Sequence, residues 1–155
     1  MMLFLVCDTS GSMSEGSKPF ITRTAVTTIA QWIHMAVGGV QIRLFAWGSE
    51  AVFSDWTITD DYPEHMLVCR GTSSATALTR LLSDSPDGKI LLLTDGFWSS
   101  TEARHLKQWR ARLPDDSVRI IKIGADANPQ LKGPDVFLAE DIFAALDEWL
   151  AAPSA

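Results

Sequence analysis

The sequence predicts an α/β domain with a doubly wound, mostly parallel sheet, helices on both faces and one antiparallel strand at the edge. Short apolar runs alternate along the chain with segments in which apolar residues recur at helical spacing. Such alternation favours a parallel sheet covered by helices on both sides. In addition, two apolar runs, residues 2–6 and 89–94, are each closely followed by an aspartate, Asp8 and Asp95, and a loop.

Length and composition limit the possible classes of protein. The 155 residues predict a single domain, with its core between about residues 2 and 150 and a frayed tail at 151–155. A formal net charge of −6 argues against nucleic-acid or membrane-surface partners. No apolar stretch approaches the roughly 20 residues that a membrane span needs. The two cysteines, Cys7 and Cys69, are too few for a disulfide scaffold and indicate a reducing, cytoplasmic setting, although their pairing stays open.

The first half of the chain predicts two long elements and an edge strand after the first apolar run. A helix is expected over residues 18–37, because Pro19 suits a first turn and two glycines follow the end of the helix. Residues 40–47 predict a strand, and 51–53 a third strand that is antiparallel because the connection is so short. The apolar face of the helix comprises Phe20, Ile21, Ala25, Ile29, Trp32, Ile33 and Ala36.

The second half repeats the alternation of strand and helix after an irregular connection. Thr72 and Ser73 occupy positions typical of N-cap residues for a helix that ends near Leu82. Ser99 and Glu102 form a capping-box signature. The predicted strands are residues 89–94, 118–123 and 136–138, and the predicted helices are 101–113 and 140–150. The apolar positions that should face inward are Ala75, Leu78, Leu81, Leu82, Leu106, Trp109, Leu113, Ile142, Phe143, Leu146, Trp149 and Leu150.

The loop after the first strand is the strongest candidate for a site. Asp8, Ser10 and Ser12 are spaced two apart, so that a roughly extended loop directs all three side chains the same way. One carboxylate and two hydroxyls form a set of hard oxygen ligands of the kind that Mg²⁺ prefers. Taken alone, the same run could equally be an ordinary Asx or Ser turn.

The predicted topology brings further oxygens to this loop. In a doubly wound sheet the first strand and the 89–94 strand are neighbours at the switch point, where a crevice opens at their carboxyl ends. Asp8 and Asp95 would then face each other, with the start of the Thr72 helix alongside. The crevice would thus combine Asp8, Ser10, Ser12, Thr72 and Asp95.

Together these residues resemble the metal-ion-dependent adhesion site (MIDAS) of von Willebrand factor type A domains. That motif combines Asp-x-Ser-x-Ser after the first strand, a Thr from a middle loop and an Asp after the fourth strand. Here the matching residues are Asp8, Ser10 and Ser12, then Thr72, then Asp95, with Thr76 as an alternative threonine. Many family members have Gly-Gly before the threonine, whereas this chain has Arg70-Gly71.

The resemblance implies a Mg²⁺ or Mn²⁺ site that binds an acidic side chain of a partner protein. The serines, and usually the threonine, would coordinate the cation directly, while the acids often act through water. Small cytoplasmic bacterial members of the family often serve MoxR-type AAA+ ATPases, or stress and defence gene clusters. By this analogy the chain is an adaptor, with a MoxR-type ATPase or a co-encoded protein as its partner.

Residues around the crevice predict the surface that a partner would contact. Phe97 and Trp98 follow Asp95-Gly96, and Gly11 and Arg70 lie in the two other loops, so we predict these four as the rim. The alternative is that Phe97 or Trp98 packs under its loop as part of the core. Trp47 and Trp56 could extend this surface, although Trp47, at the end of a strand, could equally be packed inside. A basic run on the 101–113 helix, Arg104, Lys107, Arg110 and Arg112, predicts by default a solvated face and, as the second alternative, a contact site for an acidic partner.

The sequence gives less support to an enzymatic function. A Mg²⁺-dependent phosphohydrolase using Asp8 is the main alternative, but the second acid that the haloacid-dehalogenase pattern needs is replaced by Ser10. The three histidines lack zinc-ligand spacing, and no G-x-G-x-x-G follows the first strand. Cys7, within the first strand, reads as a core residue rather than a reactive thiol. We therefore expect a binding module and not an enzyme.

Overall fold

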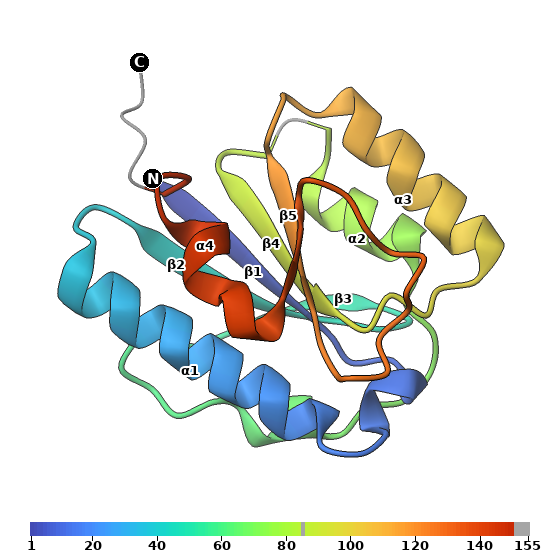
Figure 1. Cartoon of the computed structure of the whole chain (residues 1–155), viewed down its shortest axis with the longest axis horizontal. Helices are drawn as coiled ribbons and strands as arrows, with labels where there is room; N and C mark the ends of the chain where they lie inside the picture. The colour runs from blue at the N-terminus through green and yellow to red at the C-terminus, as the bar shows by residue number, and fades with distance from the viewer. Residues whose placement is uncertain (85, 151–155) are drawn as a thin grey trace.

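The computed structural model describes residues 1–84 and 86–150 (Figure 1). The strands are β1 (Met2–Asp8), β2 (Gln41–Trp47), β3 (Ala51–Ser54), β4 (Lys89–Thr94), β5 (Val118–Lys122) and β6 (Val136–Leu138). The α-helices are α1 (Lys18–Ala36), α2 (Ala75–Leu82), α3 (Ser100–Arg112) and α4 (Ile142–Leu146). Short 3₁₀ turns lie at Gly11–Ser14, Glu64–Leu67 and Ala139–Asp141.

The strands form one sheet in the order β3-β2-β1-β4-β5-β6. β3 pairs antiparallel with β2 at the edge, and every other pairing is parallel. β1 lies between β2 and β4, so the order along the sheet reverses next to β1, as the sequence predicts. Asp8 at the end of β1 and Asp95 just after β4 therefore lie at the carboxyl ends of adjacent strands.

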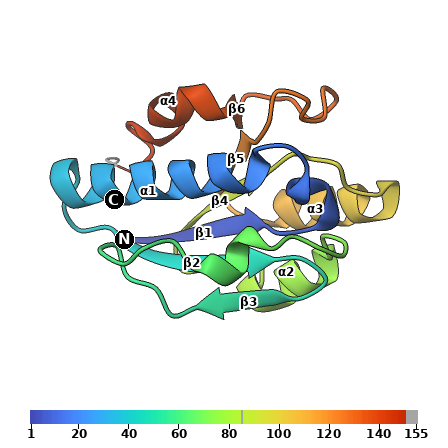
Figure 2. The ribbon, with the colours of Figure 1, turned by 90° about the horizontal axis from the view of Figure 1, so that it is seen from below.

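Helices cover both faces of the sheet, which confirms the predicted fold class. Figure 2 shows α1 and α4 on one side of the sheet and α2 on the other. Successive side chains of β1 point to opposite faces of the sheet and contribute to both cores. The α1/α4 core contains Leu3, Leu5 and Cys7, whereas the α2/α3 core contains Val6. No helix in the described part of the chain combines the length and apolar character that crossing a membrane requires.

Four residues predicted to face inward are exposed, because α1, α2 and α4 each bury fewer of their apolar positions than the sequence pattern suggests. Phe20 in the first turn of α1 and Phe143 in α4 are each about half exposed and line one shallow groove between the two helices. Ala36, the last residue of α1, is exposed as well. In α2 the buried residues are Ala75, Leu78 and Leu82, which leaves Leu81 at the flank.

Some predicted helix ends are also wrong. The N-cap of α2 is Ser74, whose hydroxyl accepts a hydrogen bond from the Ala77 N–H at 3.1 Å, and not Thr72 or Ser73. The last helix ends at Leu146 rather than Leu150, because Asp147 is extended and Glu148 has a φ of +61°. That bend lets the Trp149 indole bond the Asp116 carbonyl at 2.8 Å. The predicted tail at 151–155 lies outside the described residues.

Candidate metal centre

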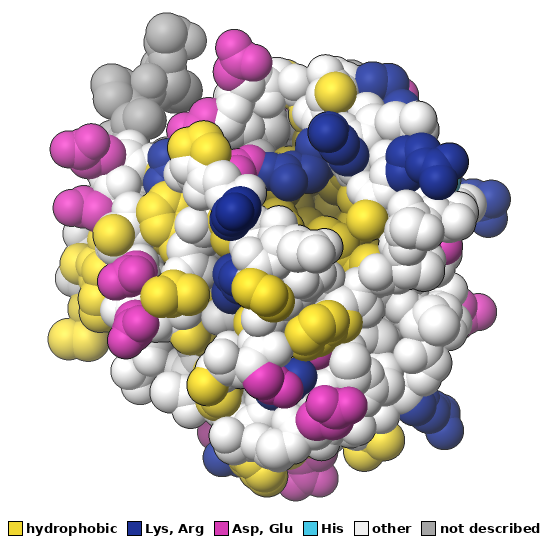
Figure 3. Space-filling view, turned by 45° about the vertical axis from the view of Figure 1, so that its right-hand side comes forward, with side chains coloured by type: hydrophobic (Ala, Val, Ile, Leu, Met, Phe, Trp, Pro, Cys, Tyr) yellow, Lys and Arg dark blue, Asp and Glu magenta, His cyan; other side chains and the backbone are white. Residues whose placement is uncertain are grey.

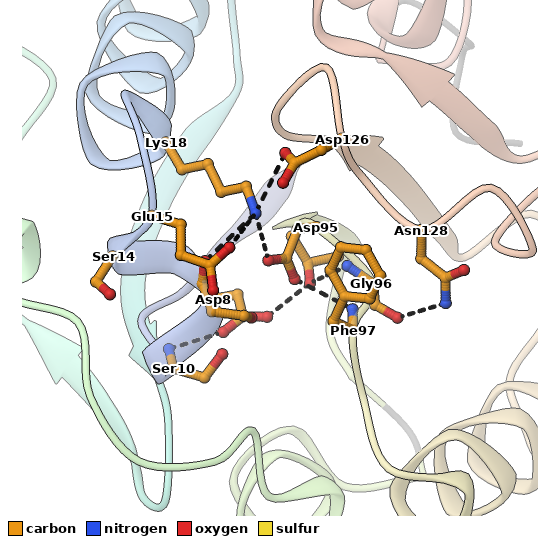
Figure 4. Close-up of polar contacts among 12 residues, drawn as sticks. Asp8, Ser10, Ser14, Glu15, Lys18, Asp95, Gly96, Phe97, Asp126 and Asn128 are labelled. Carbon is orange, nitrogen blue, oxygen red and sulfur yellow. Dashed lines mark hydrogen bonds and ion pairs between the residues drawn. The ribbon is translucent and has the colours of Figure 1, made fainter.

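The predicted site residues of the first and fourth strands meet at the carboxyl end of the sheet (Figure 4). Asp8 is the last residue of β1, and Asp95 directly follows β4. Both carboxylates are almost fully buried, with 2% of Asp8 and none of Asp95 exposed. Burying two acids so close to each other is costly unless their charges are hydrogen-bonded or paired, and the surroundings of each acid show how this is done.

Asp8 is held by uncharged donors from three segments of the chain. Its Oδ1 accepts from the Ser10 backbone N–H at 2.9 Å and from the Ser73 hydroxyl at 3.0 Å. Its Oδ2 accepts from the Thr94 hydroxyl at 2.6 Å. Burial raises the pKa of Asp8 above its usual value, and these hydrogen bonds oppose that rise. The bonds fix the orientation of the carboxylate without adding a positive charge.

Asp95, in contrast, faces a cation. Its Oδ1 accepts from the Phe97 N–H at 3.1 Å, and its Oδ2 lies 3.1 Å from the Lys18 ammonium. Lys18 is itself 3% exposed, and its ammonium also approaches Asp126 at 3.4 Å. Burial alone would lower the pKa of Lys18, but the neighbouring carboxylates of Asp95 and Asp126 outweigh it and raise the pKa. Lys18 is therefore charged at neutral pH.

The two serines of the first loop are positioned by a second loop. The Gly11 N–H donates to the Gly71 carbonyl at 2.9 Å, and the Arg70 N–H donates to the Thr9 carbonyl at 2.9 Å. Gly71 has a φ of +78°, and a Cβ there would lie 2.6 Å from the Ser49 hydroxyl, so this position requires glycine. These bonds hold residues 9–11 against residues 70–71.

Ser12 carries the clearest sign of a missing partner. Among the described residues, its hydroxyl oxygen is buried and has no hydrogen-bond partner. Ser10, in the same loop, is 4% exposed. Buried hydroxyls are nearly always bonded, so an unpartnered one points to a ligand.

The predicted threonine of the site lies at the surface. Thr72 is exposed, and its backbone N–H donates to the Ser49 hydroxyl at 3.4 Å. Thr76, the alternative, is also exposed and lies 3.4 Å from the His105 ring nitrogen. Ser73 instead provides the hydroxyl that reaches Asp8. The role of Thr72 as a ligand stays a prediction.

Sequence reasoning missed three residues of this site: Lys18, Ser73 and Thr94. The sequence pattern places Ser73 at a helix cap and Thr94 at the end of a strand, and neither position by itself indicates a contact with Asp8. Lys18 does leave a signal, because a lysine in the first turn of a helix opposes the helix dipole and needs another reason to be there. The carboxylates at the strand ends supply that reason.

The residues present fit a hard divalent cation held by both hydroxyls and acids. No three His, Cys, Asp or Glu side chains in the described ranges are grouped to hold a metal by themselves. The candidate donors are therefore mixed: the hydroxyls of Ser10 and Ser12 and the carboxylates of Asp8 and Asp95. All are oxygen ligands, which suits Mg²⁺ or Mn²⁺ better than a soft metal.

The predicted rim is partly exposed. Phe97 is 47% exposed, and the Lys18 ammonium lies 5.5 Å from the centre of its ring. Trp98 is half-buried and packs against Trp47, with ring centres 5.9 Å apart. Trp47 and Trp56 are buried, so neither of them extends the surface. Arg70 is exposed, and Gly11 is half-buried.

The basic run on α3 is partly a solvated face and partly paired. Arg104 and Lys107 are exposed, whereas Arg110 pairs with Asp135 and Arg112 with Asp84. Figure 3 shows Lys and Arg side chains gathered around a hollow on this side of the molecule. A hollow of about 700 Å³ is lined by basic and acidic residues together, so its net charge is low.

Comparison with known proteins identifies the fold. No family model and no curated protein matches the chain. Among solved structures, a von Willebrand factor type A protein from Catenulispora acidiphila superposes with a TM-score of 0.65 at 17% identity, covering 96% of this chain and 42% of that one. The manganese-loaded TRAP protein of Plasmodium vivax gives 0.61 at 18% identity, covering 97% of this chain and 73% of that one.

A third match is proximal thread matrix protein 1 of the mussel byssus, a structure with zinc in its MIDAS motif. It gives a TM-score of 0.54 at 15% identity, covering 93% of this chain and 44% of that one. At these identities the likeness concerns the fold alone. The chain has the von Willebrand factor type A fold, as the sequence predicts.

Proposed function

We propose that this protein is a metal-dependent interaction module that binds an acidic group of a partner protein through a Mg²⁺ or Mn²⁺ ion. The ion would be held by Ser10 and Ser12, with Asp8, Asp95 and Thr72 completing the set. The observation that carries the proposal is the buried, unpartnered hydroxyl of Ser12 in the described loop that follows Asp8. The acids and both serines lie where adjacent parallel strands end, a common place for ligands in this class of sheet.

The residues of this site would position oxygens rather than carry out chemistry. Hydrogen bonds from Ser10, Ser73 and Thr94 fix Asp8, so little ordering is needed when a ligand binds. When bound, the cation would offer a coordination position to a carboxylate oxygen from another molecule. Phe97, Trp98, Gly11 and Arg70 would surround that carboxylate and contact the rest of the partner.

The alternative of a phosphohydrolase has less support. Both oxygens of Asp8 accept hydrogen bonds and the residue is 2% exposed, which leaves it badly placed to attack a phosphorus atom. The general acid of that mechanism would have to be Ser10. We therefore propose that the module is not an enzyme. Mg²⁺-dependent hydrolysis of an aryl phosphate that Asp8→Asn abolishes would contradict this proposal.

The proposed partner and cellular setting are based on analogy with von Willebrand factor type A proteins. We propose an adaptor of the bacterial cytoplasm that acts with a MoxR-type AAA+ ATPase or with a co-encoded protein. Both cysteines are free in the structure, which is consistent with a reducing compartment. The exposed aromatic ring of Phe97 beside the site supports a protein partner.

Thermal unfolding with and without metal tests the proposal directly. Because a ligand that binds only the folded state stabilises it, millimolar Mn²⁺ or Mg²⁺ should raise the Tm of the native protein but not of Asp8→Asn. Asp115→Asn is the matched control, since Asp115 is an exposed acid before β5, at the opposite end of the sheet. A native Tm that neither metal changes would overturn the proposal.

Binding of the partner gives the second arm of the test. The candidate ATPase or co-encoded protein should bind the native module in Mg²⁺, and should dissociate when EDTA is added. Replacing successive surface Asp and Glu residues of that partner should identify a single acid that binding requires. Equal binding in Mg²⁺ and in EDTA would exclude a metal-mediated contact.

A further inference from the structure

Lys18 places a positive charge inside the candidate metal centre. It is the first residue of α1, and 3% of it is exposed. Its ammonium lies 3.1 Å from Asp95 Oδ2 and donates to the Ser12 carbonyl oxygen at 3.3 Å. Both partners belong to segments that would hold the divalent ion, so the lysine uses oxygens at the centre itself (Figure 4).

The same ammonium has two further partners at the surface. Asp126 Oδ1 lies 3.4 Å away and Glu15 Oε2 3.9 Å away, and each of these side chains is 67% exposed. Lys18 thus lies between one fully buried carboxylate and two solvated ones. A flexible four-carbon side chain in this position can shift toward the exposed pair without losing all its charge partners.

From this arrangement we propose that Lys18 is a built-in competitor of the divalent cation at this centre. The inference depends on the proposed function. In the metal-free protein the ammonium neutralises Asp95. When a divalent ion binds, Lys18 releases Asp95 and pairs with Asp126 and Glu15. Lys18 therefore lowers the affinity for the metal and keeps the centre neutralised at low metal concentration.

Competition predicts that removing the charge tightens metal binding. Mn²⁺ alone is the probe, with its dissociation constant measured by electron paramagnetic resonance or calorimetry. Lys18→Met, which keeps the length and loses the charge, should bind Mn²⁺ at least tenfold more tightly than the native protein. Lys18→Arg retains the charge and should not bind more tightly. Lys107→Met, which changes an exposed lysine on α3, should bind as the native protein does.

The results separate the two proposals. Equal or weaker binding by folded Lys18→Met than by the native protein overturns the competition, while the proposed function stands. Absence of Mn²⁺ binding by both proteins overturns the proposed function and the competition with it. If Lys107→Met tightens Mn²⁺ binding as much as Lys18→Met does, the effect comes from net charge in general, and the competition is also overturned.

A second measurement follows Lys18 in the native protein itself. The side-chain ammonium resonance of Lys18 in the native protein, assigned with Lys18→Arg, can be followed during titration with diamagnetic Mg²⁺. We expect this resonance to move or broaden as the lysine changes partners, while that of Lys107 stays constant. A Lys18 signal unchanged at saturating Mg²⁺ would contradict the exchange of partners.

Discussion

Asp8 and Asp95 lie at the carboxyl ends of adjacent strands, yet the fold compensates their charges in different ways. Asp8 is surrounded by hydroxyls and a backbone N–H, all uncharged and nearly all buried. Asp95 has an ammonium that is shared with exposed acids. The first arrangement orients a carboxylate without supplying a cation, whereas the second cancels the charge through a side chain that can move.

The candidate centre therefore has two halves with different properties, the surroundings of Asp8 (the Asp8 half) and the Lys18–Asp95 pair (the Lys18 half). The hydroxyl network around Asp8 ties β1, β4 and the loop before α2 together, so this half is rigid. The Lys18 half is anchored by electrostatic contacts of 3.1 to 3.9 Å, some of which reach solvent. We therefore expect substitutions in the two halves to affect stability by different mechanisms.

The largest loss of stability should come from Lys18→Met in EDTA. Removing the ammonium leaves the fully buried Asp95 carboxylate without a charge partner, and breaking a buried pair costs about 3–5 kcal/mol. Asp126→Asn removes only an exposed partner and should cost no more than about 1 kcal/mol. Urea unfolding measures both. Similar losses in the two variants would show that the Lys18–Asp95 pair is no stronger than a surface contact.

Thr94→Val should produce the next largest effect, on the Asp8 side. Its hydroxyl donates to Asp8 Oδ2 at 2.6 Å and accepts from the Gly96 N–H at 3.0 Å. A hydrogen bond to a charged group is worth about 1.5–3 kcal/mol, so we expect a loss in that range. Thr79→Val is the control, because that hydroxyl donates to a carbonyl of its own helix. A loss no greater than that of the control would mean that Asp8 does not depend on Thr94.

Ser73→Ala and Thr72→Val separate the structural hydroxyl from the predicted ligand. Ser73 is 5% exposed and bonds Asp8, so its loss should lower the free energy of unfolding by about 1–2 kcal/mol. Thr72 is exposed, so Thr72→Val should change stability by less than about 0.5 kcal/mol. If Thr72 is a ligand, Thr72→Val should nevertheless weaken Mn²⁺ binding, as measured by calorimetry. Weakened binding in Ser73→Ala alone would assign the ligand role to Ser73.

The fold was predictable from sequence because its signals are local and repeated. Buried strands such as residues 89–94 have a continuous apolar centre, and the helical periodicity of the segments between the strands indicates the alternation of strand and helix. The adjacency of Asp8 and Asp95 could also be predicted from the sequence, because topology rules place the first and fourth strands side by side. The exact start of α2 did not follow, because residues 72–74 offer three hydroxyl side chains in a row, and only tertiary contacts choose the cap among them.

The electrostatic half of the centre was not predictable in the same way. Glu102 illustrates the difficulty: its sequence spacing predicts a capping box with Ser99, and the Ser99 hydroxyl does accept from the Glu102 N–H at 3.2 Å. The Glu102 carboxylate, however, accepts from the Ala75 N–H at the start of α2. Long charged side chains such as Glu102 and Lys18 find partners through the tertiary structure, which sequence spacing does not encode.

The smallest expected effect concerns the access of water to the surroundings of Asp8. Cys7, the residue that precedes Asp8, reports on this access. Burial raises the pKa of Cys7 to about 12, and that of the half-buried Cys69 to about 11. A raised pKa keeps a thiol protonated, so both cysteines should react slowly with iodoacetamide at about pH 8, and Cys7 should react only after unfolding. Mass spectrometry of the alkylated peptides measures each rate, with the protein in urea as the reference. Rapid labelling of Cys7 in the native protein would show that water reaches the end of β1, and that the Asp8 half is as open as the Lys18 half.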